Sequence, residues 1–221
     1  MTVQSSPSSR RFHPVRDEIA NAVTHGIGFA LSIAGLVLLL IWAIAKGDAR
    51  HIVSFAIYGA CLVVTYGIST LYHYARSRRH KFRLRMLDHC SIFLLIAGSC
   101  TPFMVVTLDS GSGWVLLGIV WAIAIIGILG KLFVSHKPSR RSTFMYIALG
   151  WLSILAVVPL YKGLGWQGFF LLLCGGLAYT GGTFFFNRDH RQYFHAVWHV
   201  FVLAGSGLHF AAVAVFLVPW A

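Results

Sequence analysis

The sequence predicts an all-α membrane protein, a bundle of seven transmembrane helices with the N-terminus in the cytoplasm and the C-terminus outside. Three observations support this prediction: the composition, the number of apolar stretches and the distribution of basic residues. The 221 residues are 57% hydrophobic and 11% charged, and their mean hydropathy is +0.75. A soluble domain typically carries about 25% charged residues, so the composition excludes an ordinary soluble globule.

The apolar stretches set the expected number of spans. A helix needs about 20 apolar residues to cross the hydrocarbon core, and a spanning segment must be helical to satisfy its own backbone hydrogen bonds in lipid. The basic, polar residues 1–16 are expected to form a disordered cytoplasmic tail, and residues 17–221 one seven-span domain. The seven predicted spans are residues 19–45, 52–75, 87–107, 113–134, 143–161, 166–186 and 193–219.

Lysine and arginine alternate strictly between the segments that connect these spans. The N-terminal tail and the second, fourth and sixth connections, counted with Lys131 at the end of the fourth span, carry 15 of the 18 basic residues, whereas the other connections carry 3. Cytoplasmic loops hold an excess of lysine and arginine. We therefore expect a multi-pass protein of the plasma (inner) membrane with a cytoplasmic N-terminus. Since topology accounts for the net charge of +12, nucleic-acid binding is excluded as an explanation for it.

Two histidines form the first candidate site. His195 and His199 lie four residues apart near the start of the seventh span, and this spacing puts both imidazoles on one helix face. The same spacing lets two histidines bind one metal ion, although the glutamate of the zinc-protease motif is missing here. Taken alone, the pair also fits two packed histidines.

Three polar residues on other spans are predicted to lie at the same depth as this pair. His73 and Ser69 lie near the end of the second span, and Asp88 lies at the start of the third. With a rise of 1.5 Å per residue, the histidines and Asp88 fall within a layer about 10 Å thick near the cytoplasmic face. Three imidazoles with one open position are typical of a catalytic zinc site. Asp88 would either bind the water or ligate directly, and Ser69 would support the site.

Further polar residues lie within the predicted spans. Glu18, Asn21 and His25 share one face of the first helix and are expected to support the site from there. His89 points about 100° away from Asp88 and is a more distant alternative ligand. His209 lies about 15 Å beyond His199 and is predicted to be a hydrogen-bonded core residue.

The motifs, taken together, resemble those of the hemolysin III proteins, the bacterial branch of the progestin and adipoQ receptor (PAQR) family. The resemblance runs from about residue 17 to 212 and rests on Glu18-x-x-Asn21-x-x-x-His25, Ser69-x-x-x-His73, Leu87-Asp88-His89 and His195-x-x-x-His199. It implies a seven-helix bundle with an intramembrane Zn²⁺ bound by the three histidines of the predicted layer. It also implies that Asp88 holds the zinc-bound water and that Ser69 supports the site.

Three functions are compatible with these features. The first is zinc-dependent hydrolysis of a membrane lipid amide, because the family is distantly similar to alkaline ceramidases; Asp88 would then act as general base and acid. The second is a non-enzymatic sensor of lipid or membrane state with a structural zinc. The third is a pore-forming cytolysin, suggested by the family name, although the sequence shows no ring of charged residues along a path. In each case the expected partner is membrane lipid.

Overall fold

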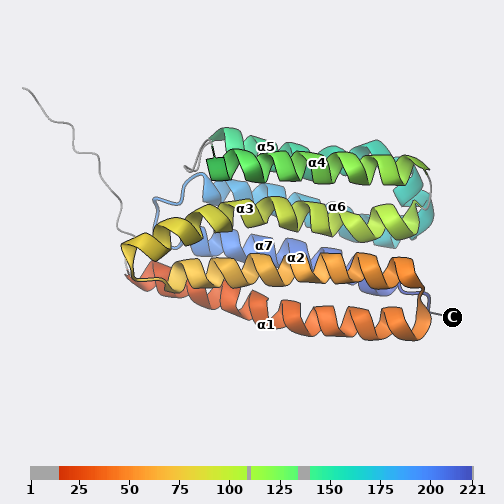
Figure 1. Ribbon diagram of the computed structural model, residues 1–221, viewed down its shortest axis with the longest axis horizontal. Coiled ribbons are helices and arrows are strands. Elements are labelled where there is room, and N and C mark those ends of the chain that lie inside the picture. Colours follow the sequence, from red (N-terminus) through yellow and green to blue (C-terminus); the bar gives the residue numbers. More distant parts are fainter. Residues whose placement is uncertain (1–14, 109–110, 134–139, 221) are drawn as a thin grey trace, which may run out of the picture.

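The computed structural model describes residues 15–108, 111–133 and 140–220, and the described residues form long helices without any strand. The helices run side by side along the long axis of the molecule (Figure 1). Most of the predicted tail, residues 1–14, lies outside the described residues, while Val15 and Arg16 already belong to the first helix. The helices are α1 (Val15–Lys46), α2 (Ala49–Tyr74), α3 (Arg78–Pro102), α4 (Gly111–Phe133), α5 (Arg140–Trp151), α6 (Val157–Phe186) and α7 (Phe194–Phe216).

The described helices include six candidate membrane spans, or seven when one long segment is divided. That segment, Ser142–Phe186, contains 45 residues in one nearly unbroken helical run. The spans predicted at 143–161 and 166–186 therefore are not separated by a loop. A straight helix of this length would measure about 68 Å, roughly twice the hydrocarbon thickness. The run instead breaks at Gly165, where φ is +66°, and the chain turns back toward the end from which α5 starts (Figure 1).

The third span also differs from its prediction at one end. Residues 78–86 were expected in a basic connection, but α3 begins at Arg78, so these residues add more than two helical turns. Arginine, lysine, leucine and methionine are good helix formers, which explains why a segment that is too polar to lie in lipid continues the helix. This extension places Lys81 beside the first helix.

The outer surface of the bundle is apolar. Ile27, Ile41 and Ile126 are each at least half exposed, which would be unfavourable for a soluble monomer. Between the helices, small residues allow close contact: a Cβ atom on Gly28 would lie 2.7 Å from side-chain atoms of Leu203 and Tyr66. An apolar exterior with small residues between helices is expected for spans packed in lipid. The chain is a multi-pass integral membrane protein.

The order of packing brings four helix ends together. Helix α1 packs against α2 and α7, α2 packs against α3, and α6 packs against α7. The start of α1, the end of α2, the start of α3 and the start of α7 all lie at the same end of the bundle (Figure 1). The polar residues predicted to form or support the metal site lie toward these four ends, whereas His209 lies farther along α7.

Candidate metal centre

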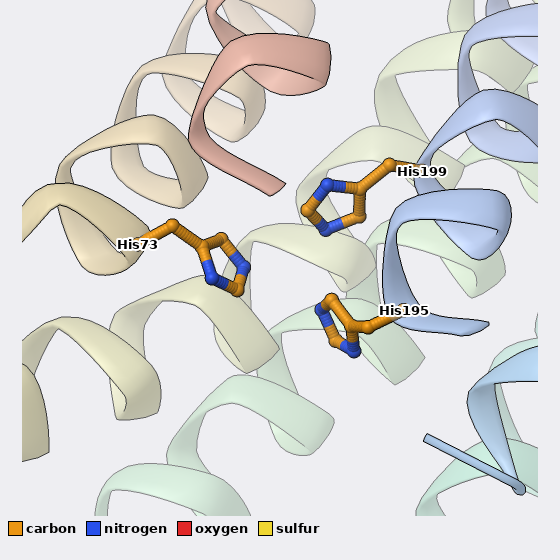
Figure 2. A group of neighbouring side chains, drawn as sticks. All are labelled: His73, His195 and His199. Carbon is orange, nitrogen blue, oxygen red and sulfur yellow. The ribbon is translucent and has the colours of Figure 1, made fainter. Parts of the chain in front are cut away.

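Three histidines from two helices meet inside the bundle. His73 of α2 and His195 and His199 of α7 each offer one ring nitrogen, and these nitrogens lie within 4.8 Å of one another. The ring centroids are separated by 4.7 to 5.1 Å. Figure 2 shows the His73 ring approaching from one side and the two α7 rings from the other. The cluster could hold a metal ion.

The ring of His73 is oriented by an acidic residue of α1. Its Nδ1 lies 2.9 Å from Oε2 of Glu18, and since a carboxylate only accepts, Nδ1 carries the proton. Oε1 of Glu18 pairs with Nζ of Lys81 at 2.7 Å. The other nitrogen of His73, Nε2, is buried and has no hydrogen-bond partner among the described residues. A carboxylate that holds one nitrogen while the other faces a cluster is the usual environment of a metal-ligating histidine.

His199 is oriented by α1 in a similar way. Its Nδ1 lies 3.0 Å from the hydroxyl of Thr24 and 3.2 Å from the backbone carbonyl of Asn21. Because the Thr24 hydroxyl donates to the carbonyl of Ala20 at 2.9 Å, it accepts from Nδ1. The opposite nitrogen, Nε2, then carries the lone pair that a metal requires. His25 stacks on the His199 ring with the centroids 3.4 Å apart.

This donor set fits the Zn²⁺ ion predicted from the sequence. Neutral imidazole nitrogens are common ligands of zinc and of other transition metals, and the contacts of His73 and His199 favour the neutral tautomers that expose Nε2. The buried, unpartnered Nε2 of His73 would gain a partner when a metal binds. The residues present thus fit a three-histidine metal site, while the identity of the metal depends on supply and geometry.

Asp88 and Ser69 lie at the same cavity as two of these histidines. Asp88 of α3, Ser69 of α2, His195 and His199 all line one cavity of about 260 Å³. The Oγ atom of Ser69 is buried beside the Asp88 carboxylate and makes no close hydrogen bond among the described residues. Such a hydroxyl beside a carboxylate is a place where water or a polar group of a ligand binds favourably.

The remaining predicted residues have distinct placements. Glu18 contacts His73 directly, and His25 is buried against the His199 ring. Asn21 reaches His199 through its backbone carbonyl, while its buried side-chain oxygen has no hydrogen-bond partner among the described residues. His89 lies outside the cluster, with Nδ1 3.6 Å from Oδ2 of Asp88.

Sequence reasoning missed three residues near the site. Lys81 was counted only as a basic connecting residue, yet it binds Glu18. Thr24 precedes His25 and carried no signal, because its role depends on how closely α7 approaches α1. Asp17 is 4% exposed and its Oδ1 is unpartnered among the described residues. The spacing of four residues between Asp17, Asn21 and His25 would have indicated this stripe.

The cavity beside the histidines is mostly apolar. Its wall includes Leu95, Ile96 and Leu172, which come from α3 and α6. A few polar groups at one end of a largely apolar cavity are typical of sites that bind small apolar ligands.

Comparisons with known proteins show which proteins the chain is similar to. Residues 13–210 match the family described as Haemolysin-III related. The chain is 44% identical over 207 residues to Hemolysin-3 of Bacillus cereus, an alignment that covers 94% of each protein. It is 45% identical over 204 residues to Hemolysin-3 homolog of Bacillus subtilis (strain 168), covering 92% of this chain and 96% of that protein. It is also similar to human Monocyte to macrophage differentiation factor, at 28% identity over 94% of this chain and 88% of that protein.

Proposed function

The chain belongs to the haemolysin-III related family, and from this premise we propose that it is a zinc-dependent hydrolase of an amide bond in a membrane lipid. The observation that supports the proposal most directly is the three-histidine cluster at one end of an apolar cavity, with Asp88 in the same cavity wall. The apolar wall would hold the acyl chain, while the polar end would receive the amide. The distant similarity to alkaline ceramidases favours an amide over other bonds.

In this proposal His73, His195 and His199 hold the metal. A bound Zn²⁺ supplies Lewis-acid polarisation of a carbonyl and lowers the pKa of a coordinated water to about 7. Glu18 keeps the Nδ1 proton on His73 and so directs Nε2 toward the cluster. Thr24 and the Asn21 carbonyl do the same for His199.

Asp88 is assigned the proton transfers of the reaction. It would accept a proton from the attacking water and return that proton to the nitrogen of the departing amine, so that an amine and a carboxylic acid leave the site. Ser69 is assigned a hydrogen bond to a polar atom of the water or of the amide, because its hydroxyl makes no close hydrogen bond among the described residues.

The decisive test uses purified protein in lipid nanodiscs, loaded with zinc and supplied with ceramides and other N-acyl lipids. We expect fatty-acid release by the wild type. Asp88→Asn should retain zinc while its rate falls by about 10²- to 10⁴-fold, the usual contribution of a general acid–base group. His73→Ala should lose both zinc and turnover. Zinc-loaded wild type that cleaves none of these lipids would contradict the proposal.

A second candidate is a lipid or membrane-state sensor with a structural zinc. One observation favours it: the cluster joins α2 to α7, and α1 contacts ligands from both helices, so a metal there would stabilise the bundle. In that case His73→Ala should lower the thermal unfolding temperature, whereas Asp88→Asn should produce no functional defect.

A further inference from the structure

The cavity has a second polar region, far from the three-histidine cluster. It is formed by His209 of α7 and Tyr179 of α6, whose rings lie 5.3 Å apart and which both line the cavity. His199 and His209 are ten residues apart on one helix, which separates the two regions by about 15 Å along the axis. Apolar side chains, including Leu95, Leu172 and Val202, line the cavity as well. The polar side chains that line the cavity therefore include groups at the level of His199 and at the level of His209.

His209 is held in one orientation. Its Nδ1 donates to the carbonyl of Gly205 at 2.8 Å, so the acceptor nitrogen of the neutral ring is Nε2. The ring also depends on a glycine of α6, because a Cβ atom on Gly175 would lie 2.4 Å from Nδ1. His209 is 8% exposed. A buried imidazole deep within a span suggests a function, and the metal cluster lies too far away to use it.

The polar groups around His209 are satisfied by one another. The hydroxyl of Tyr179 lies 2.8 Å from Oγ of Ser206, and the hydroxyl of Tyr66 donates to the same Oγ at 2.7 Å. The Tyr179 ring lies 5.3 Å from the His209 ring. This network fixes the surroundings of His209, and no described residue makes a hydrogen bond with its Nε2, so this atom can accept one from a ligand in the cavity.

We propose that the cavity binds lipids whose chain carries a hydroxyl group, with the His209 Nε2 accepting the hydrogen bond from that hydroxyl. An extended chain advances roughly 1.2 Å per bond, as a fully extended backbone does, so 15 Å corresponds to about a dozen bonds between the carbonyl at the histidine cluster and the hydroxyl. The assignment of the carbonyl end rests on the proposed function, while the hydroxyl site rests on His209 alone.

The test measures binding of free fatty acids, which need no turnover. Purified protein in detergent is titrated with stearic acid, 12-hydroxystearic acid and 2-hydroxystearic acid, in competition with a fluorescent fatty acid. One hydrogen bond to a buried acceptor should make the 12-hydroxy acid bind about three- to tenfold more tightly than stearic acid. The 2-hydroxy acid should gain nothing, since its hydroxyl would remain at the histidine cluster.

Variants then assign the preference to the imidazole. His209→Phe should abolish it, His209→Gln should retain part of it through an amide acceptor, and the exposed control His190→Phe should keep it. If His209→Phe does not fold, the comparison of His209→Gln with the wild type still shows whether the preference for the 12-hydroxy acid depends on the imidazole. Equal binding of stearic and 12-hydroxystearic acid by the wild type, or an unchanged preference in His209→Gln and His209→Phe, would overturn the proposal. Failure of lipid hydrolysis alone would not, because the preference is measured without catalysis.

Discussion

At the scale of single residues, the candidate metal centre depends on hydrogen bonds that fix which nitrogen of each imidazole carries a proton. Lys81, Glu18 and His73 form a continuous chain, with contacts of 2.7 and 2.9 Å. Lysine holds one carboxylate oxygen, so the other is directed at the ring. This arrangement prepares Nε2 of His73 for a metal before any metal arrives, which reduces the cost of ordering the site.

The first prediction concerns Glu18. Glu18→Ala should weaken zinc binding by about 10- to 100-fold, as is usual when the hydrogen-bond partner of a ligating histidine is removed. Lys81→Met should have a smaller effect in the same direction, because Glu18 then keeps its contact with His73 but loses its ion pair with Lys81. Competition with a zinc chelator measures the affinity, and the exposed Asp48→Asn serves as the acidic control. An unchanged affinity in Glu18→Ala would show that the carboxylate does not orient a ligand.

The second prediction separates a side-chain role from a backbone role on α1. Since Nδ1 of His199 contacts the Thr24 hydroxyl but only the backbone carbonyl of Asn21, Thr24→Val should lower zinc affinity more than Asn21→Ala does. The same chelator competition checks it. A greater loss in Asn21→Ala would mean that the Asn21 side chain supports the site, as the sequence pattern alone had suggested.

The residues of the cluster could be predicted from the sequence, but their supporting contacts could not. Spacing placed His195 and His199 on one face, and distance from the basic connections placed His73 at the same depth. Such arguments locate a residue along a span. They do not give its neighbours across a helix interface, which is why the contacts of Thr24 and Lys81 were found only in three dimensions.

At the scale of helices, Gly165 explains how one long helical run supplies two spans. The sequence predicted two separate spans joined by a short connection at 162–165. In the structure that connection is only a break at Gly165 within the helical run Ser142–Phe186. At Gly165 the backbone has φ +66° and ψ 177°, a conformation that is essentially restricted to glycine. The direction of α6, and with it the wall of the cavity, depends on this residue.

The third prediction follows from that conformation. Gly165→Ala should destabilise the protein by about 1–3 kcal/mol, the range for a residue forced into a sparsely populated backbone region. The open space around its Cβ position means that strain rather than a clash would cause the loss. The matched control is Gly118→Ala, an exposed helical position in α4 with equally open surroundings, which should be neutral or stabilising. Thermal unfolding in detergent compares the two variants, and equal midpoints would contradict the explanation.

At the scale of the whole molecule, the orientation in the membrane determines which solution reaches the histidine cluster. The four helix ends that carry the cluster and its surroundings lie at one end of the bundle (Figure 1). The described segments at that end include the connections α2–α3 and α6–α7, which carry Arg76, Arg188 and Arg191, and the sequence divides lysine and arginine 15 to 3 between alternate segments. Applied to this bundle, the excess of positive charge on cytoplasmic segments predicts that the cluster lies near the cytoplasmic face.

The fourth prediction tests that orientation. Alkaline phosphatase, which is active only after export, should be active in a bacterial host when fused beyond α7 and inactive when fused in the connection between α6 and α7. Green fluorescent protein at the same two positions should give the opposite pattern, because seven spans place these points on opposite sides.

Replacing Arg188 and Arg191 by glutamine is the informative variant. The other basic segments should maintain the orientation in the membrane, so both reporters should keep their pattern. Phosphatase activity at the α6–α7 connection of the wild type would place the cluster on the outer side, and a lipid of the outer leaflet would then become the substrate to test.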